Sequence, residues 1–251
     1  MILDDIVQRT EKRVAQLPTS FSESVLHKPV SLSAAIRGRT GRNAVIAEIK
    51  CASPSRGIIR RNVDMAQMAG VLSGAGCVAL SVLTEPYFFG GTGQDIARVK
   101  SAVDIPVLRK DFIIDERQIA ESNALGADAV LLIAAVLKKN LPTFVDLARE
   151  YQLEPLVEVH NAAEAELALG TNAALIGINN RDLATMTIDR STTRLLSEQI
   201  RPEGRLIVSE SGMRSADDIR EMRNYCDAFL IGSSIMADAH PRKKLEEFVC
   251  A

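Results

Sequence analysis

The sequence contains few of the residues from which metal and redox sites are usually built. Its four cysteines are isolated and lack the paired spacing of a zinc or redox motif. The three histidines, His27, His160 and His240, form no cluster, so we expect no metal site and interpret His160 as a loop or structural residue. Such cysteines are typical of a reduced cytoplasmic protein, and we expect that location.

Long apolar runs and a strong net charge are also absent. No run of about 18 apolar residues is present to span a membrane. The first residues, MILDDIVQRTEKR, mix acids and bases and lack the apolar core of a secretory signal, so we expect none. The net charge of −2 shows no excess of positive charge that would favour nucleic acid or an anionic membrane. We therefore expect neither partner, and any anion site must be local.

What the sequence does contain is a repeat of short, apolar, β-branched runs that end in polar residues. They start roughly 20 to 35 residues apart, which leaves room for one helix between strands. The length of 251 residues and the 47% hydrophobic content suit one large α/β domain. We predict a single domain over residues 1–251, a closed (β/α)8 TIM barrel. The runs are 44–50, 78–84, 106–112, 129–134, 154–160, 175–180, 205–211 and 228–234.

Residues 1–43 precede the repeat and are predicted to be an N-terminal helical extension. Apolar residues from Ile2 to Leu17 recur at near-helical spacing, which predicts an amphipathic helix laid on the barrel. Pro18, Ser20 and Ser22 interrupt it, and Ser31 is placed to cap a second, short helix. Between the strands, residues 115–126, 161–170 and 215–222 carry clear helical patterns.

Polar residues occupy the carboxyl ends of the runs, where barrel enzymes carry their active sites. Alternate residues of a strand share a face, so Glu48 lies with Lys50 and Asn179 with Arg181. If these faces point inward, they meet Lys110 and Glu158 at the barrel mouth. The same pattern groups Ser211 with Ile207 and Ser209. Glu210 would then need a local strand distortion to reach the site.

Two lysines and two carboxylates in one cup can run acid and base steps without a metal. A lysine that is desolvated or crowded by another cation loses its proton near neutrality, whereas a nearby glutamate keeps it protonated. The alternative is that Glu48–Lys50 and Glu158–Lys110 are only buried ion pairs.

Two further features indicate a phosphorylated small-molecule ligand. Ser211-Gly212 and Gly232-Ser233-Ser234 follow the last two runs, whose loops supply the phosphate site in many barrels. Phe89 and Phe112 lie just beyond strand ends, where they could wall an aromatic ligand or simply join the core. The glycine-rich loops at 53–57 and 88–93 are expected to be mobile over a ligand.

The strings at these positions resemble indole-3-glycerol phosphate synthase from about residue 44 to residue 236. The resemblance implies ring closure of 1-(2-carboxyphenylamino)-1-deoxyribulose 5-phosphate, with loss of carbon dioxide and water, and no cofactor or metal. Cys51 departs from the basic residue common in the family, and Gly90–Gly93 is richer in glycine. The matching strings are Ala47-Glu-Ile-Lys, Ser53-Pro-Ser, Pro106-Val-Leu-Arg-Lys-Asp-Phe, Pro155-Leu-Val-Glu-Val-His, Gly177-Ile-Asn-Asn-Arg, Ser209-Glu-Ser-Gly and Leu230-Ile-Gly-Ser-Ser.

The resemblance also implies roles for individual residues. Lys110 would act as general acid on the substrate carbonyl oxygen, and Glu158 would stabilise the cationic intermediate and transfer protons during dehydration. Lys50, held by Glu48, would position the substrate, and either lysine could supply the acid that expels water. The remaining matches are Asn179, Ser211 and Glu210 among catalytic residues, and Arg181, Ser53, Phe89, Phe112, Gly212, Gly232 and Ser233 among substrate-binding residues.

Three other interpretations are compatible with the residues. Another phosphosugar barrel, such as phosphoribosylanthranilate isomerase, is one, and an aldolase using Lys110 as a Schiff-base nucleophile is a second. A non-catalytic phosphate-binding barrel is the third. The surface pattern is compatible with a monomer or a weak homodimer.

Overall fold

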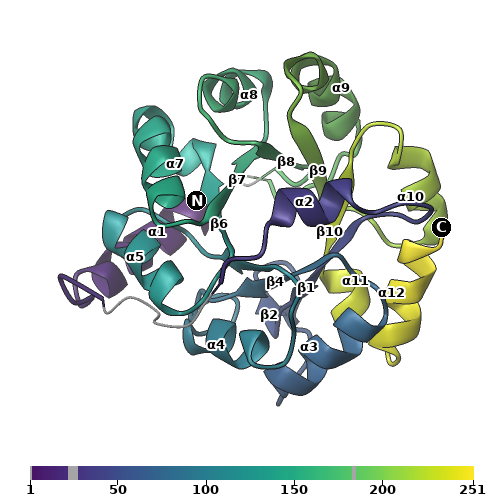
Figure 1. Cartoon of the computed structure of the whole chain (residues 1–251), viewed down its shortest axis with the longest axis horizontal. Helices are drawn as coiled ribbons and strands as arrows, with labels where there is room; N and C mark the ends of the chain where they lie inside the picture. The colour runs from purple at the N-terminus through teal and green to yellow at the C-terminus, as the bar shows by residue number, and fades with distance from the viewer. Residues whose placement is uncertain (1, 22–27, 183–184) are drawn as a thin grey trace.

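The computed structural model describes residues 2–21, 28–182 and 185–251. Eight parallel strands close into a barrel, in which β1 pairs with both β4 and β10 (Figure 1). The predicted TIM barrel is confirmed, because each predicted run contains one barrel strand. The barrel strands are β1 (Val45–Ile49), β4 (Ala79–Leu83), β5 (Val107–Lys110), β6 (Ala129–Ile133), β7 (Glu154–Val159), β8 (Leu175–Asn179), β9 (Leu206–Glu210) and β10 (Ala228–Ile231).

Helices fill the intervals between the strands and surround the barrel (Figure 1). Asp115, Asn161 and Ser215 cap three of the predicted helices, because each side chain accepts a hydrogen bond from the first turn. The elements are α3 (Met65–Gly74), α4 (Gln94–Lys100), α5 (Glu116–Ala124), α6 (Ala134–Leu137), η1 (Lys138–Asn140), α7 (Leu141–Glu150), α8 (Ala162–Leu169), α9 (Ser191–Ile200), η2 (Arg201–Glu203), α10 (Ala216–Met222), α11 (Ser233–Met236) and α12 (Pro241–Val249).

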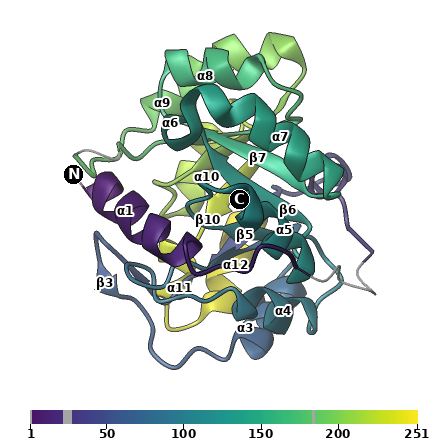
Figure 2. The same ribbon diagram turned by 90° about the vertical axis from the view of Figure 1, so that its left-hand side faces the viewer.

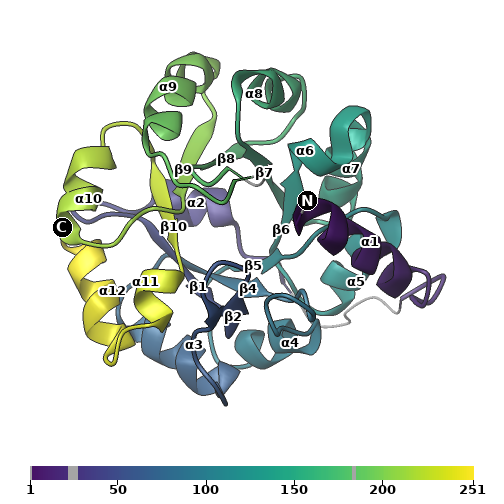
Figure 3. The ribbon, with the colours of Figure 1, turned by 180° about the vertical axis from the view of Figure 1, so that it is seen from behind.

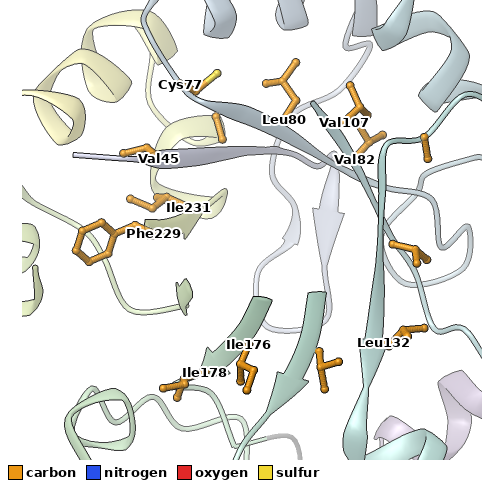
Figure 4. Close-up of a cluster of buried hydrophobic side chains, with 14 of the residues drawn as sticks. Val45, Cys77, Leu80, Val82, Val107, Leu132, Ile176, Ile178, Phe229 and Ile231 are labelled. Atoms are coloured by element: carbon orange, nitrogen blue, oxygen red, sulfur yellow. The ribbon is translucent and has the colours of Figure 1, made fainter. Parts of the chain in front are cut away.

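The strands separate two apolar clusters, one between strands and helices and one inside the barrel. Val45, Leu132 and Ile176 belong to the outer cluster (Figure 4). Ile46 and Leu131, their neighbours along the chain, belong to the inner cluster. This alternation is the period-two pattern of a strand that is covered on both faces. It also directs Glu48, Lys110 and Glu158 inward, as predicted.

The predicted facing of β9 was wrong. Ile207 packs in the outer cluster, and Ser209 is buried outside the barrel against Thr193, whereas Val208 lies in the inner cluster. Glu210 therefore points inward without any strand distortion. The error arose because Ser211 was assigned the parity of the strand, although the strand ends at Glu210 and Ser211 has a left-handed φ of 64°.

The two N-terminal helices lie at opposite ends of the barrel. Figure 1 shows α2 (Leu32–Arg37) in front, whereas Figure 3, from behind, shows α1 (Ile2–Val14) in front. Figure 2 shows α1 lying along the outside of one end. Ser31 caps α2 as predicted. Ser22 and His27 lie outside the described residues, and the division into one domain with an extension at 1–43 remains a prediction.

The loop after β1 contains a hairpin that was not predicted. A small antiparallel hairpin of β2 (Ala52–Ser53) and β3 (Gly57–Ile58) forms within the glycine-rich loop after β1. Gly57 has a φ of 63°, which favours glycine where the hairpin turns. The hairpin follows the carboxyl end of β1. Its residue Ser53 lines the cavity at that end of the barrel.

Candidate active site

A cavity of about 450 Å³ opens at the carboxyl ends of the barrel strands. This volume is in the range of small-molecule sites. Every residue that the sequence assigned to the site lines it: Glu48, Lys50, Ser53, Phe89, Lys110, Phe112, Glu158, Asn179, Arg181, Glu210, Ser211, Gly212, Gly232 and Ser233.

Lys110 lines the cavity, and its ammonium group pairs with two carboxylates. Its Nζ atom donates to Glu158 Oε2 at 3.0 Å and to Glu210 Oε2 at 2.8 Å. Burial alone would lower the pKa of Lys110, but the carboxylates of Glu158, Glu210 and Glu48 outweigh burial and raise the pKa. Lys110 is thus held as a cation, which disfavours its use as a neutral Schiff-base nucleophile.

The two carboxylates that share Lys110 have opposite pKa shifts. Burial would raise the pKa of Glu158, but Lys110 and His160 lower it below its ordinary value. Burial raises the pKa of Glu210 to about 7, since the repulsion from Glu158 and Glu48 adds to burial and Lys110 only partly offsets both. Two carboxyl groups whose pKa values are pushed apart are suited to different proton-transfer roles.

Two glycines make room for the carboxylates inside the barrel. A Cβ atom at Gly177 would lie 2.2 Å from Glu210 Oε1, and one at Gly232 would lie 2.2 Å from Glu48 Oε1. Glu210 Oε1 is buried and has no hydrogen-bond partner among the described residues. An unpartnered buried acceptor beside a cavity is a group that a ligand can satisfy.

A second ion pair lines the cavity on the β1 side. Lys50 Nζ lies 2.6 Å from Glu48 Oε1, and the lysine side chain is 14% exposed. The predicted pairing of these two residues is therefore confirmed. Both pairs line an open cavity, so a small molecule that enters it can contact them.

Three arginines make the rim of the cavity cationic. Burial lowers the pKa of Arg181, and the nearby charge of Arg56 and Arg214 lowers it further. The Arg181 N–H donates to Asn179 Oδ1 at 3.0 Å, which ties the end of β8 to its loop. All three arginines line the cavity, so the site attracts an anion.

The opposite wall is apolar and includes residues that the sequence did not indicate. The rings of Phe89 and Phe112 lie 6.3 Å apart between centroids, tilted by 34°. Ile2, Leu3 and Ile6 of α1 complete this wall. Ser53 Oγ, which also lines the cavity, is buried without a hydrogen-bond partner among the described residues. An apolar wall with a few unpartnered polar atoms suits an aromatic ligand that carries a polar group.

His160 lies against the site although the sequence analysis did not place it there. Its Nε2 atom lies 3.3 Å from Glu158 Oε1, so it contacts the site from behind. Its position two residues after Glu158, just past the end of β7, was the signal that could have revealed this contact.

The described residues were also compared with the features of metal sites and membrane spans. In ranges 2–21, 28–182 and 185–251, no three His, Cys, Asp or Glu side chains group as a metal site. In the same ranges, no helix has the length and apolar character needed to cross a bilayer.

Fold and cavity together define a (β/α)8-barrel enzyme with an acid–base cluster and a cationic rim. The family model for indole-3-glycerol phosphate synthase matches residues 3–248. The chain belongs to this family, whose members are carboxy-lyases of tryptophan biosynthesis.

Individual relatives agree with this assignment, and a solved structure agrees with the fold. The chain is 43% identical to indole-3-glycerol phosphate synthase of Caldanaerobacter subterraneus subsp. tengcongensis, over 99% of this chain and 98% of the relative. It is 41% identical to the Methanocaldococcus jannaschii protein of the same name, over 98% and 91%. A tryptophan synthase structure from M. tuberculosis is similar in fold, with a TM-score of 0.66, 12% identity, and coverage of 89% of this chain and 98% of that one.

Proposed function

We propose that the cavity residues carry out the family reaction, the ring closure of 1-(2-carboxyphenylamino)-1-deoxyribulose 5-phosphate to indole-3-glycerol phosphate. A bond forms between the aromatic ring carbon and the substrate carbonyl carbon, and carbon dioxide and then water leave. The observation that carries the assignment is the Lys110 ammonium, held between Glu158 and Glu210 in the lining of the cavity.

Lys110 is the general acid in this proposal. Its raised pKa keeps it protonated at neutral pH, so it can donate to the carbonyl oxygen as the ring carbon attacks. Attack leaves positive charge on the ring system. The ionised carboxylate of Glu158, which pairs with Lys110, stabilises that charge. Loss of carbon dioxide then returns the bonding electrons to the ring and removes that charge.

Dehydration needs a base for the ring proton and an acid for the departing hydroxyl. Glu158 serves in this proton transfer, and Glu210, with a pKa of about 7, can also accept or return a proton near neutrality. Lys50, paired with Glu48, positions the substrate and is the second candidate for the acid that expels water.

The phosphate and the aromatic carboxylate give the substrate its anionic groups. We assign the phosphate to Arg181 and to the loops at Gly212, Gly232 and Ser233, where backbone N–H groups and a guanidinium can converge. The aromatic ring would lie against Phe89 and Phe112. Ser53, Asn179 and Ser211 supply the polar contacts around it.

We also propose a cytoplasmic enzyme that is a monomer or a weak homodimer. Its described cysteines are all free, which suits a reducing compartment. The exposed large hydrophobic side chains, Ile58, Tyr87, Tyr151 and Leu195, belong to separate segments and do not suggest an extensive interface. Sedimentation of the purified chain over a range of concentrations measures the state directly.

The decisive experiment is to incubate the purified chain with the carboxyphenylamino substrate and follow indole fluorescence. We expect fluorescence to appear without any added metal or cofactor. No signal from correctly folded protein would favour a non-catalytic phosphate-binding barrel. Borohydride treatment with substrate is the companion test, since a covalent adduct at Lys110 would replace the acid–base assignment by a Schiff-base mechanism.

A further inference from the structure

The cluster around Lys110 extends beyond the cavity through His160. Glu158 divides its two oxygen atoms between two cations: Oε2 accepts from Lys110 Nζ at 3.0 Å, and Oε1 lies 3.3 Å from His160 Nε2. His160 follows the end of β7, and its side chain is 11% exposed. It does not line the cavity, so it can act on a ligand only through Glu158.

The imidazole of His160 is also held by Glu164, through its other ring nitrogen. Glu164, in the first turn of α8, accepts from the backbone N–H of His160 at 2.9 Å and lies 3.0 Å from its Nδ1 atom through the same oxygen, Oε2. The other oxygen of Glu164 accepts from Asn161 Nδ2 at 2.6 Å, and Asn161 caps the helix. The ring is therefore oriented by a carboxylate that the start of α8 holds in place.

We propose that His160 is a positioning residue for Glu158: the imidazole, anchored by Glu164, holds one oxygen of Glu158 so that the other remains on Lys110. This inference rests on the proposed function, because it gives Glu158 its catalytic importance. A carboxylate with two cationic neighbours cannot rotate away from the lysine without losing one of them. The arrangement fixes the geometry that general acid–base catalysis requires.

The charges around the imidazole support its cationic form. Burial would lower the pKa of His160, but the neighbouring carboxylates of Glu158 and Glu164 raise it to about 10. Lys110 on β5 and His160 lower the pKa of Glu158, and Glu210 on β9 and Glu48 on β1 are the further carboxylates that act on this cluster. Removal of His160 takes a cation from Glu158, so the pKa of Glu158 rises.

Kinetics of His160→Ala and His160→Gln test the proposal, with His240→Gln as the matched control at an exposed histidine. We expect kcat to fall about tenfold in His160→Ala, with KM changed less than about twofold, since His160 does not touch the cavity. Glutamine keeps a donor but no charge, so its kcat loss should be smaller. In both variants the acid limb of the pH profile should move to higher pH.

Nuclear magnetic resonance of the histidine rings gives a readout that is independent of turnover. The chain has only three histidines, so His160→Gln and His240→Gln assign the signals. We expect His160 in the wild-type enzyme to be doubly protonated at pH 8 and to titrate at lower pH in Glu158→Gln. Glu164→Gln should shift the same titration downward and lower kcat by less than His160→Ala does.

The outcomes separate this inference from the proposed function. An active wild type whose His160 variants keep its kcat and pH profile, and lose only thermal stability, would make His160 merely structural and overturn the inference. A neutral His160 ring at pH 8 would overturn it too. A folded wild type without turnover would remove the proposed function, and the titration in Glu158→Gln would still decide whether His160 holds Glu158.

Discussion

Two charge clusters lie on opposite sides of one strand, β5, and they are built differently. Lys110 points into the barrel, whereas its chain neighbour Arg109 is almost completely buried and does not line the cavity. Asp111, one residue past the end of β5, is also buried and lies at the edge of the cavity lining. Arg109 Nη2 lies 3.1 Å from Asp111 Oδ2 and 2.7 Å from Glu121 Oε2. Arg13 of α1 lies 2.8 Å from the other oxygen of Asp111. Arg13, Arg109, Asp111 and Glu121 form what we call the outer charge cluster, which ties β5, α5 and α1 together. The inner charge cluster consists of Lys110, Glu158 and Glu210.

The difference between the two clusters lies in how completely their polar atoms are paired. Arg109 also donates to Thr84 Oγ1 and Ser122 Oγ, and with Arg13 this cluster holds two cations for two carboxylates. Inside the barrel, one ammonium serves two carboxylates, one oxygen of Glu210 has no hydrogen-bond partner in the part of the chain that the structure describes, and the pKa of Glu210 is about 7. The outer cluster is therefore suited to stability. The inner cluster leaves favourable interactions unmade until a ligand enters, which is the usual compromise at an active site.

The sharpest test of the outer cluster is Arg109→Met. Removing one member of a buried, hydrogen-bonded ion pair leaves the other uncompensated, so we expect the free energy of unfolding to fall by about 3–5 kcal/mol. Urea unfolding measures this loss. Arg220→Met is the control, because its exposed pair with Asp217 should change stability by less than about 1 kcal/mol. If Arg109→Met remains stable but loses turnover as Lys110 variants do, the outer cluster does not serve mainly to stabilise the fold.

The next largest effect is expected for Lys110→Ala. Turnover should fall by at least about two orders of magnitude, the usual contribution of a general acid. The stability loss should be smaller than for Arg109→Met, since water can enter the cavity and Glu210 can take up a proton there. Steady-state kinetics and urea unfolding of the same preparations test both statements. A wild-type rate would remove Lys110 from the chemistry.

The inner cluster was largely predictable from the sequence. Period-two alternation correctly directed Glu48, Lys110 and Glu158 inward, because each lies within or next to a regular strand whose other face is continuously apolar. The same rule failed at Ser211, one residue past the end of β9, where the backbone leaves the strand and parity no longer has meaning. The alternation rule therefore predicts the direction of a side chain only for residues within the strand.

The outer cluster and the wall contributed by α1 could not be predicted in this way. Arg13 meets Asp111 across 98 positions of the sequence, and nothing in the amphipathic pattern of α1 says which part of the barrel it covers. The contacts of His160 were not predicted for a similar reason. A grouping of histidines with one another gives no sign of a histidine that pairs with glutamates, here Glu158 of β7 and Glu164 of α8.

Arg181→Ala should give an intermediate effect on the inner side. An anionic ligand would lose a planar cationic partner, so we expect KM to rise about tenfold and kcat to fall as well. Inhibition by inorganic phosphate should weaken in parallel. Arg242→Ala, at an exposed pair with Glu246 on α12, is the matched control and should behave as the wild type does. Unchanged kinetics in Arg181→Ala would exclude this side chain from the anion site.

The smallest effect, and the one that most directly separates the two clusters, is the pH dependence of stability in Glu210→Gln. Because folding raises the pKa of Glu210 from 4.5 to about 7, the folded state binds more protons than the unfolded state between these values. Glu210 therefore makes the wild type lose stability as pH rises through that window, and its contribution is neutral below pH 4.5.

Glutamine cannot titrate, so the stability of Glu210→Gln relative to the wild type should improve by about 1 kcal/mol from pH 5.5 to pH 6.5. No such change is expected for Asp111→Asn between these pH values, because Arg109 and Arg13 outweigh the burial of Asp111 and lower its pKa below its ordinary value of 3.8, so that this carboxylate is already ionised in both the folded and the unfolded state. Its stabilising contribution is lost only as the pH falls below about 4. Urea unfolding of both variants at the two pH values makes the measurement, and a Glu210→Gln variant that loses stability relative to the wild type with rising pH would show that the inner carboxylate, too, is there to hold the fold.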